Sequence, residues 1–368
     1  MMRMPVFADL QRRFFPYPFF EVAKKITQKE VARIARVHPS TVCLAMVNNP
    51  MIATATRDRI MAVAEKLGYV RDPMLGALAA YRRTTKSVVF HGVLAWVVHN
   101  EGGYDWSRVP QYRDYLEGIK ERAAELGYKV EIFDLKSYQG NYERLNGVFR
   151  SRNIRGALFC PQPKPHTLLP LRFDEISAVT IGYTLQSPKL HMISTNHFAS
   201  MREILQQMRG RGYRRIGYAL PAVYDERIDN NYRAAYYLER ESWPESEWIP
   251  QFTEPVNAAN FRGWLKTHKP DAVIISHEIF PELLTELKIP VPQKLGVATP
   301  SVVGSYANFA GIDDDSREVG RVAVAFLTSL VERGERGIPH RPQRVLVRGV
   351  WHEGRSLRAP GLPGAVVH

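Results

Sequence analysis

The sequence predicts two folds in one chain: an all-α helix-turn-helix headpiece, followed by an α/β body of two doubly wound parallel-sheet lobes. Helix-start and helix-stop signals crowd into the first part of the chain, and strand-like apolar runs alternate with amphipathic helices from residue 87 onward. These alternating units are too many for one sheet, so we expect two. The expected divisions are a flexible arm at 1–24, the headpiece at 25–70, a linker helix at 71–86 and the body at 87–368.

The first helix of the headpiece begins at a capping box. Glu30 follows Thr27 by three residues, so each side chain can accept a hydrogen bond from a backbone N–H at the helix start. Val31, Ile34 and Ala35 fall on one face at the 3.6-residue period, and we expect that face to be buried.

A short turn at 36–38 separates this helix from a second one. Pro39 suits the first helical position, where its missing N–H costs nothing. We expect Val42, Ala45 and Met46 to point inward. Two short helices joined by a tight turn form a helix-turn-helix.

A third helix is predicted over residues 56–67. Ile60, Val63 and Ala64 recur at helical spacing and should pack on the same small core. Gly68 is expected to end this helix, because glycine readily takes the left-handed conformation found just past helix ends.

In this order, the residues resemble the headpiece of the lactose repressor (LacI) family of bacterial transcription regulators. The matching positions are Thr27, Glu30, Val31, Ala32, Ala35, Val37, Thr41, Val42, Thr56, Arg57, Ile60, Leu67, Gly68 and Tyr69. Four positions depart from the family pattern. Arg36 replaces the turn glycine, His38 and Cys43 replace serines, and Leu44 stands where many members carry a base-reading arginine. We therefore expect an unusual DNA site.

The resemblance implies that the second helix enters the major groove of a pseudo-palindromic operator. Pro39, Ser40, Cys43 and Leu44 would lie nearest the bases, so apolar contact with thymine methyls should carry much of the specificity. The full set expected at DNA is Thr27, Pro39, Ser40, Thr41, Cys43, Leu44, Asn48, Thr56, Arg57, Tyr69 and Leu78.

The linker carries the apolar residues Leu75, Leu78 and Ala79 in a strip too short to be a stable helix alone. The resemblance makes it a hinge helix that pairs with its copy in a homodimer, with Leu78 wedged between base steps in the minor groove. The alternative is an ordinary linker whose leucines pack on the body.

Charge is concentrated at the N-terminal end of the chain. The formal net charge is +13, and residues 1–87 hold 15 Lys or Arg against 6 Asp or Glu, while the rest hold 35 against 31. This asymmetry is typical of a phosphate-binding module, whose affinity falls steeply with salt. A merely solvated basic tail is the alternative.

Cysteine content and hydropathy limit the compartment. The only cysteines, Cys43 and Cys160, fall in different predicted domains, so neither a disulfide framework nor a cysteine-rich metal site is credible. No apolar run approaches the roughly 20 residues that span a bilayer, and no signal peptide is recognisable. We expect a cytoplasmic protein with no membrane partner. Residues 1–20 are interpreted as a flexible arm or an over-extended start.

The body shows a regular alternation of strands and helices. Predicted strands lie at residues 88–98, 129–133, 156–160, 178–182, 215–219, 272–276 and 295–298, and predicted helices at 112–126, 142–150, 198–209 and 232–239. This part of the chain resembles the family's large domain, which is similar to periplasmic sugar-binding proteins. Segments 116–128, 211–216 and 311–323 carry the resemblance.

Ligands of open parallel sheets bind at the carboxyl ends of the strands, so the loops there supply the candidates for an effector site. The loop at 99–106 combines hydrogen-bonding groups with aromatic faces, as a sugar requires. Arg227 lies near a position where relatives bind an effector. The candidates are Asn100, Tyr104, Trp106, Gln162, Arg227, His277 and Thr299, each with a structural role as the alternative. Thr195, residues 276–278 and Thr299 depart from family ligand positions, so the resemblance does not identify the effector.

No catalytic, cofactor or metal motif is visible. The acidic run at 313–315 is interpreted as a helix start or a solvated loop. We expect a ligand-responsive transcription regulator that acts as a repressor and has a carbohydrate effector. The alternatives are a small-molecule binding protein with a degenerate headpiece and, last, an enzyme on the same scaffold.

Overall fold

The computed structural model describes residues 26–46, 49, 51–69 and 90–360. Its chain divides into two compact units, Met1–Arg82 and Arg83–His368. We keep the name headpiece for residues 26–69 and use body for residues 90–360. Asn48, Leu78, the linker at 71–86 and the N-terminal arm lie outside the described residues.

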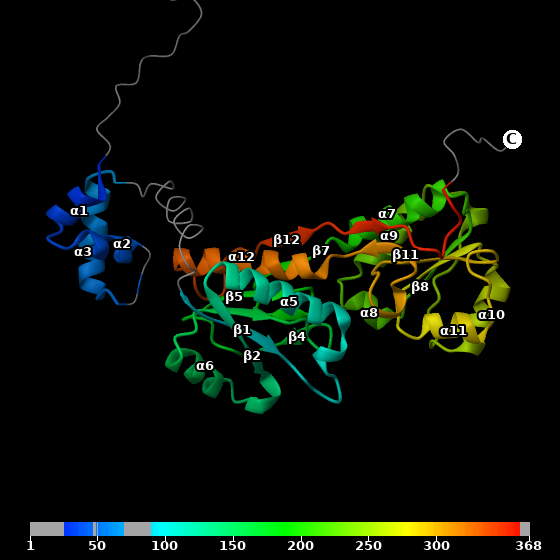
Figure 1. The fold of residues 1–368 in the computed structure, drawn as a ribbon, viewed down its shortest axis with the longest axis horizontal. Helices are drawn as coiled ribbons and strands as arrows, with labels where there is room; N and C mark the ends of the chain where they lie inside the picture. The colour runs from blue at the N-terminus through cyan, green and yellow to red at the C-terminus, as the bar shows by residue number, and fades with distance from the viewer. Residues whose placement is uncertain (1–25, 47–48, 50, 70–89, 361–368) are drawn as a thin grey trace, which may run out of the picture. The chain divides into compact units, whose positions relative to one another are not determined.

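Three helices form the headpiece (Figure 1): α1 (Gln28–Ile34), α2 (Pro39–Met46) and α3 (Thr54–Lys66). The predicted capping box is present, because the Glu30 carboxylate accepts from the Thr27 N–H at 2.7 Å and the Thr27 hydroxyl accepts from the Glu30 N–H at 3.4 Å. The buried core consists of Val31, Ala32, Ala35, Val42, Ala45, Ile60 and Ala64.

Ile34 is a correction to the expected core. Its side chain is 44% exposed, whereas Ala32 is buried. Successive residues of a helix are rotated by about 100°. Ala35 and Ala32 therefore lie on one side of Val31, and Ile34 lies on the other side. The core of this seven-residue helix is displaced toward Ala32, which the periodicity alone did not distinguish.

Two residues take left-handed backbone conformations at the turns of the headpiece. Gly68, with φ of 63°, ends α3 as predicted, and its N–H donates to the Glu65 carbonyl at 3.0 Å. Arg36, with φ of 52°, holds the same conformation in the turn between α1 and α2. A non-glycine residue in this region costs about 1–2 kcal/mol.

Replacing Arg36 with glycine should therefore stabilise the headpiece by up to about 1 kcal/mol, since the relief of strain exceeds the added entropy of the unfolded chain. Hydrogen exchange of the α1 and α2 amides in the full chain measures this local free energy. Arg33→Gly is the matched control, because Arg33 lies in the last turn of α1, where glycine costs about 1 kcal/mol. Faster exchange in Arg36→Gly would contradict the prediction.

The first lobe of the body is a six-stranded parallel sheet in the order β12-β7-β5-β3-β1-β2. The strands are β1 (Gly92–Val98), β2 (Tyr128–Asp134), β3 (Gly156–Phe159), β5 (Ser177–Ile181), β7 (His191–Thr195) and β12 (Arg344–Val347). Helices α5 (Pro110–Glu125) and α12 (Ser316–Arg333) cover one face, and α6 (Tyr142–Ser151) covers the other (Figure 1). A two-stranded sheet, β4 (Thr167–Leu168) and β6 (Leu185–Ser187), lies in the same part of the chain.

The second lobe is a five-stranded sheet in the order β13-β11-β10-β9-β8. Its strands are β8 (Ile216–Ala219), β9 (Ala272–Ile275), β10 (Gly296–Thr299), β11 (Ala310–Asp313) and β13 (Val350–His352). Helices α7 (His197–Gly210) and α9 (Asn231–Arg240) pack on one face, and α10 (Ala258–His268) and α11 (Phe280–Glu286) on the other. The short helix α8 (Ala222–Glu226) follows β8.

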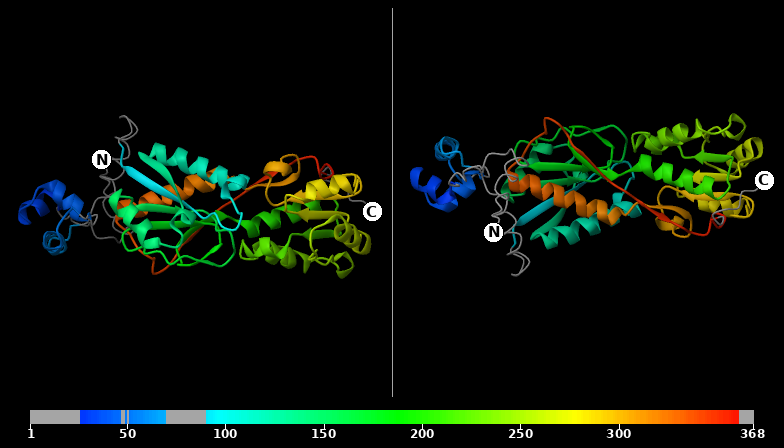
Figure 2. Two further views of the ribbon diagram at one scale, coloured as in Figure 1. Left: turned by 90° about the horizontal axis from the view of Figure 1, so that it is seen from below. Right: turned by 90° about the horizontal axis from the view of Figure 1, so that it is seen from above.

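The chain passes between the two lobes after β7, after β11 and after β12, and the two views of Figure 2 show these crossings within the body. Because each lobe contains segments from distant parts of the sequence, neither is a contiguous stretch of chain. The predicted fold class, a helix-turn-helix unit plus two doubly wound lobes, is confirmed. One feature differs: β13 runs antiparallel to β11 at the edge of the second sheet.

Candidate functional site

The surface of the headpiece around α2 is the first candidate site. His38 caps α2, since its Nδ1 accepts from the Ser40 N–H at 3.3 Å. The Ser40 hydroxyl lies 2.8 Å from the same nitrogen. The tautomer of the ring sets which atom is the donor in this second contact. Histidine thus takes the helix-capping position, and the Ser40 hydroxyl already has a partner within the headpiece.

The start of α2 is also fixed to α1. The side-chain amide of Gln28 donates to the Pro39 carbonyl at 2.6 Å. Ser40 and Cys43 are exposed on α2, while Thr41 and Leu44 are half-buried. The helix therefore presents a rigid face of one hydroxyl, one thiol and apolar carbon.

Arg57 organises the loop before α3. Its Nη2 donates to the carbonyls of Asn49 at 3.1 Å and Ile52 at 3.0 Å. Thr56 is half-buried beside it, and Tyr69 packs against the headpiece core. In this structure the Nη2 atom of Arg57 is engaged by the protein itself, and contact of Arg57 with DNA stays a prediction.

Exposed basic side chains supply the charge that sequence reasoning did not assign to individual residues. Lys29, Arg33, Arg36 and Arg59 are exposed on the headpiece. Between residues 26 and 69 there are six Lys or Arg against three Asp or Glu. Such a surface attracts a polyanion through release of condensed counterions.

The junction of the two lobes is the second candidate site. Arg227, which follows α8 in the second lobe, donates from Nη1 to the Pro163 carbonyl at 2.6 Å and from Nη2 to the Tyr112 hydroxyl at 2.8 Å. Pro163 follows β3, and Tyr112 lies in the first turn of α5, both in the first lobe. One guanidinium therefore joins the lobes at the carboxyl ends of their strands, where ligands of such sheets bind.

Tyrosines surround this arginine. Burial, and to a smaller extent the neighbouring Tyr112, raises the pKa of Tyr104. The Tyr104 hydroxyl is buried and has no hydrogen-bond partner among the described residues. Burial alone would lower the pKa of Arg227, but the hydroxyls of Tyr112 and Tyr104 outweigh it and raise that pKa. The ring of Tyr224 meets His277 edge to face, with centroids 5.0 Å apart. Aromatic faces and hydrogen-bonding groups thus occur together here.

The other four predicted effector residues make internal contacts. Asn100 bonds to Asp134 at 3.0 Å and accepts from the Trp106 N–H, Trp106 packs edge to face on Trp96, Gln162 donates to the Cys160 carbonyl at 2.6 Å, and Thr299 donates to the Ser301 carbonyl at 3.2 Å. Each of these four side chains, like Arg227, has a partner within the protein, and the assignment of effector contacts stays a prediction.

A buried polar network at the junction was not predicted. Asp314 is 4% exposed and accepts from the hydroxyls of Ser301 at 3.0 Å and Ser316 at 2.9 Å, and Gln111 of the first lobe donates to Ser301 at 2.9 Å. Burial, only partly offset by these hydroxyls, raises the pKa of Asp314 to about 6. The acidic run at 313–315 is therefore only partly a helix start: Asp315 caps α12, and Asp314 is neither a cap nor solvated.

A half-buried histidine completes the junction. His197, at the start of α7, lies with Nδ1 3.1 Å from the Tyr232 hydroxyl and Nε2 3.4 Å from the Ser194 hydroxyl. Burial lowers the pKa of His197 to about 4. The histidine is therefore neutral near pH 7, and no sequence motif distinguishes it from the other histidines of the chain.

The part of the chain that the structure describes offers neither a metal centre nor a membrane-spanning helix. No group of three or more His, Cys, Asp or Glu side chains in that part of the chain could hold a metal ion. None of the helices described combines the length and apolarity that crossing a membrane requires.

Known proteins resemble this chain in the headpiece and over most of its length. The family model for bacterial regulatory proteins, lacI family, matches residues 27–72. An uncharacterised HTH-type transcriptional regulator of Bacillus subtilis is 22% identical over 323 residues, which cover 83% of this chain and 93% of the relative. The sucrose operon repressor of Escherichia coli is 25% identical over 186 residues, and the match covers only about half of each chain, 50% and 53%.

Solved structures share the fold of the chain. The transcriptional regulator CelR–cellobiose complex superimposes with a TM-score of 0.52 at 18% identity, covering 90% of this chain and 99% of that one. The lac repressor dimer bound to operator and the anti-inducer ONPF gives a TM-score of 0.52 at 14% identity, covering 91% and 100%. At these identities the likeness shows the architecture alone.

Proposed function

From its membership of the lacI family of bacterial regulatory proteins, we propose that this chain, a DNA-binding transcription regulator, represses its target promoters as a homodimer under the control of a small sugar. The sugar binds at the junction of the lobes and changes the affinity of the headpiece for a pseudo-palindromic operator by linkage. The capped helix-turn-helix, with its matched residues 27–72, is the single observation that carries the DNA-binding role.

The chemistry of α2 supports an operator of unusual sequence. Leu44 and Cys43 place apolar or weakly polar atoms on the reading face, and the Ser40 hydroxyl already lies 2.8 Å from His38 Nδ1. Apolar contact suits the C5-methyl of thymine, whereas guanine is usually read by the paired donors of arginine or lysine. We propose a site rich in thymine methyls at the positions that α2 faces.

The junction supports a sugar as effector. Arg227, Tyr104 and Tyr224 place a forked donor, a buried hydroxyl and an aromatic ring in one region. Sugars need hydrogen bonds at their hydroxyls and apolar contact on their ring faces. Relatives and structural neighbours of this chain include a sucrose operon repressor and complexes with cellobiose and sucrose.

A gel-shift titration with genomic fragments tests the DNA-binding proposal. We expect a sequence-preferring complex at low salt whose affinity falls at least tenfold when salt is raised fourfold, because counterions are released from the phosphates. Leu78→Lys should abolish this complex while tryptophan fluorescence stays unchanged, since all six tryptophans lie in the body. A chain that shows no sequence preference at low salt would instead be a small-molecule binding protein with a degenerate headpiece.

A thermal-shift screen of mono- and disaccharides on the full chain tests the effector proposal. A sugar that binds only the folded state raises the melting temperature by mass action. We expect Arg227→Met to weaken that sugar at least tenfold, because the guanidinium is replaced by an apolar chain of similar length. Arg262→Met is the matched control, because Arg262 is an exposed residue of α10. Equal losses in both variants, or no shift with any sugar, would reject a carbohydrate site at Arg227.

A further inference from the structure

A polar pocket lies at the end of the first lobe that is opposite to the junction. Its volume is about 200 Å³. Residues 154–155 lead into β3, and 172–176 lead into β5, so the pocket lies at the amino ends of two paired strands. The third wall is α6. We propose that this pocket binds a small phosphate monoanion or phosphate monoester.

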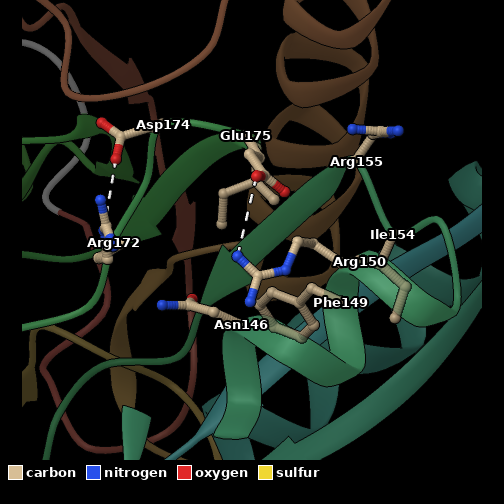
Figure 3. Close-up of a pocket in the computed structure, with 9 residues that line it drawn as sticks. Asn146, Phe149, Arg150, Ile154, Arg155, Arg172, Asp174 and Glu175 are labelled. Atoms are coloured by element: carbon tan, nitrogen blue, oxygen red, sulfur yellow. Dashed lines mark ion pairs between the residues drawn. The ribbon is translucent and has the colours of Figure 1, made fainter. Parts of the chain in front are cut away.

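An unpartnered buried amide supports a ligand in this pocket. Asn146, on α6, is 8% exposed, and its Nδ2 has no hydrogen-bond partner among the described residues. A buried donor without an acceptor costs about 1–3 kcal/mol. Asn146 lines the pocket together with Arg150 from the next turn of α6, and Arg172 lines it from the opposite side (Figure 3). An oxygen atom that reached the amide by a small movement of the pocket wall would satisfy it, because the nitrogen itself is shielded from solvent.

Guanidinium groups around the amide offer donors to an anion. Arg150, Arg155 and Arg172 line the pocket against two carboxylates, Asp174 and Glu175, while a third carboxylate, Glu143, lies 3.9 Å from Arg172 outside the lining. The dashed lines in Figure 3 mark two loose ion pairs, Arg150–Glu175 at 3.8 Å and Arg172–Asp174 at 3.7 Å.

These pairs are too long to be charge-assisted hydrogen bonds, which measure about 2.7–2.9 Å. The nearby Arg152–Glu131 pair, by contrast, closes to 2.6 Å. Arg150 and Arg172 are 53% and 69% exposed, so their guanidinium groups can turn toward a bound oxyanion. The negative charges of Asp174 and Glu175 would then repel polyphosphates more strongly than a monoanion.

Size and donor number select the class of anion. A pocket of this volume is smaller than the roughly 300–1,000 Å³ that hold drug-sized ligands. Phe149, Ile154 and Ile176 are buried beneath it and offer a short apolar wall. Guanidinium forks and an amide supply donors for three or four oxygens, which fits phosphate better than the two oxygens of a carboxylate. The pocket shares no residue with the lobe junction, so it is independent of the proposed sugar site.

Isothermal titration of the full chain with inorganic phosphate, and separately with glycerol 3-phosphate, tests the proposal at constant ionic strength in chloride. We expect saturable binding with one site per chain. Arg172→Gln should weaken it at least tenfold. Asn146→Asp, which keeps the shape but replaces the donor with a negative acceptor, should abolish it. Arg262→Gln on α10 is the control and should leave binding unchanged.

Stronger binding of glycerol 3-phosphate than of inorganic phosphate would identify a monoester as the ligand, and the reverse order would identify the free ion. The absence of saturable binding at millimolar concentrations of either anion would overturn the proposal. So would unchanged binding in both pocket variants. Arg172 is mostly exposed, so the Arg172→Gln chain is expected to fold, and near-ultraviolet circular dichroism of the tryptophans checks this. The result does not depend on whether the headpiece binds DNA.

Discussion

Replacing Gly118 with alanine is expected to destabilise the body by about 3 kcal/mol or more, at the upper end of the cost of overpacking. Gly118 lies on α5 where this helix crosses α12. A Cβ atom at Gly118 would overlap the backbone carbonyl of Arg317, and one at Gly320 of α12 would overlap the carbonyl of Tyr115. Backbone atoms in two packed helices cannot move aside as the tip of a flexible side chain can. The two helices would have to separate.

Urea unfolding followed by tryptophan fluorescence measures this effect in the body, which holds all six tryptophans. Gly147→Ala is the matched control, since this glycine lies in α6 and a Cβ there meets nothing within 4 Å. Alanine at that position should stabilise the chain by about 0.5–1 kcal/mol through helix propensity. A Gly118→Ala chain as stable as wild type would show that the close crossing of α5 and α12 is absent in solution.

The headpiece was predicted nearly completely because its signals are local. The capping box at Thr27, the proline at the start of α2 and the glycine after α3 each act within one turn of chain. Ile34 was misplaced because the side of α1 that faces the core depends on where α2 and α3 lie. That information is not contained in the period of a seven-residue helix.

In the body, apolar runs predicted the central strands, such as β1 and β9, together with their neighbours in the sheets. The strands not predicted are β4, β6, β7, β11, β12 and β13. Among them, β12 pairs with β7 and β13 with β11, and both pairings depend on chain crossings between distant segments. The same limit applies to the site. Arg227 was predicted, whereas its partner Tyr112 reads in sequence as one more helical aromatic. Residue types in loops suggest chemistry, but whether a side chain is free for a ligand depends on contacts that only folding creates.

Two titratable groups at the junction should give the stability of the body opposing pH dependences. Burial raises the pKa of Asp314 from 3.8 to about 6, so its contribution to stability is fully present below pH 3.8 and is lost as the pH rises through 6. Burial lowers the pKa of His197 from 6.5 to about 4, so its contribution is present above pH 6.5 and is lost as the pH falls toward 4. Each amounts to about 3 kcal/mol at most.

Between about pH 4 and 6 the two pH dependences of the free energy of unfolding cancel. In this range the folded state binds a proton at Asp314, while the unfolded state binds one at His197. Asp314→Asn removes the pH-dependent contribution of Asp314 to stability. The stability of this variant relative to wild type should therefore rise by about 2–3 kcal/mol from pH 4 to 7.5. His197→Gln removes the contribution of His197, and its stability relative to wild type should fall by a similar amount over the same interval.

Urea unfolding of the full chain at several pH values, followed by tryptophan fluorescence, measures both differences. Subtracting the wild-type curve removes the exposed carboxylates, such as Glu125 and Glu353, whose pKa values are lowered by arginines and which are common to all three chains. Parallel curves for wild type and Asp314→Asn would mean that Asp314 is solvated in the folded protein. The junction would then be open to water at this point, or the hydrogen bonds from Ser301 and Ser316 would offset the burial of Asp314 completely.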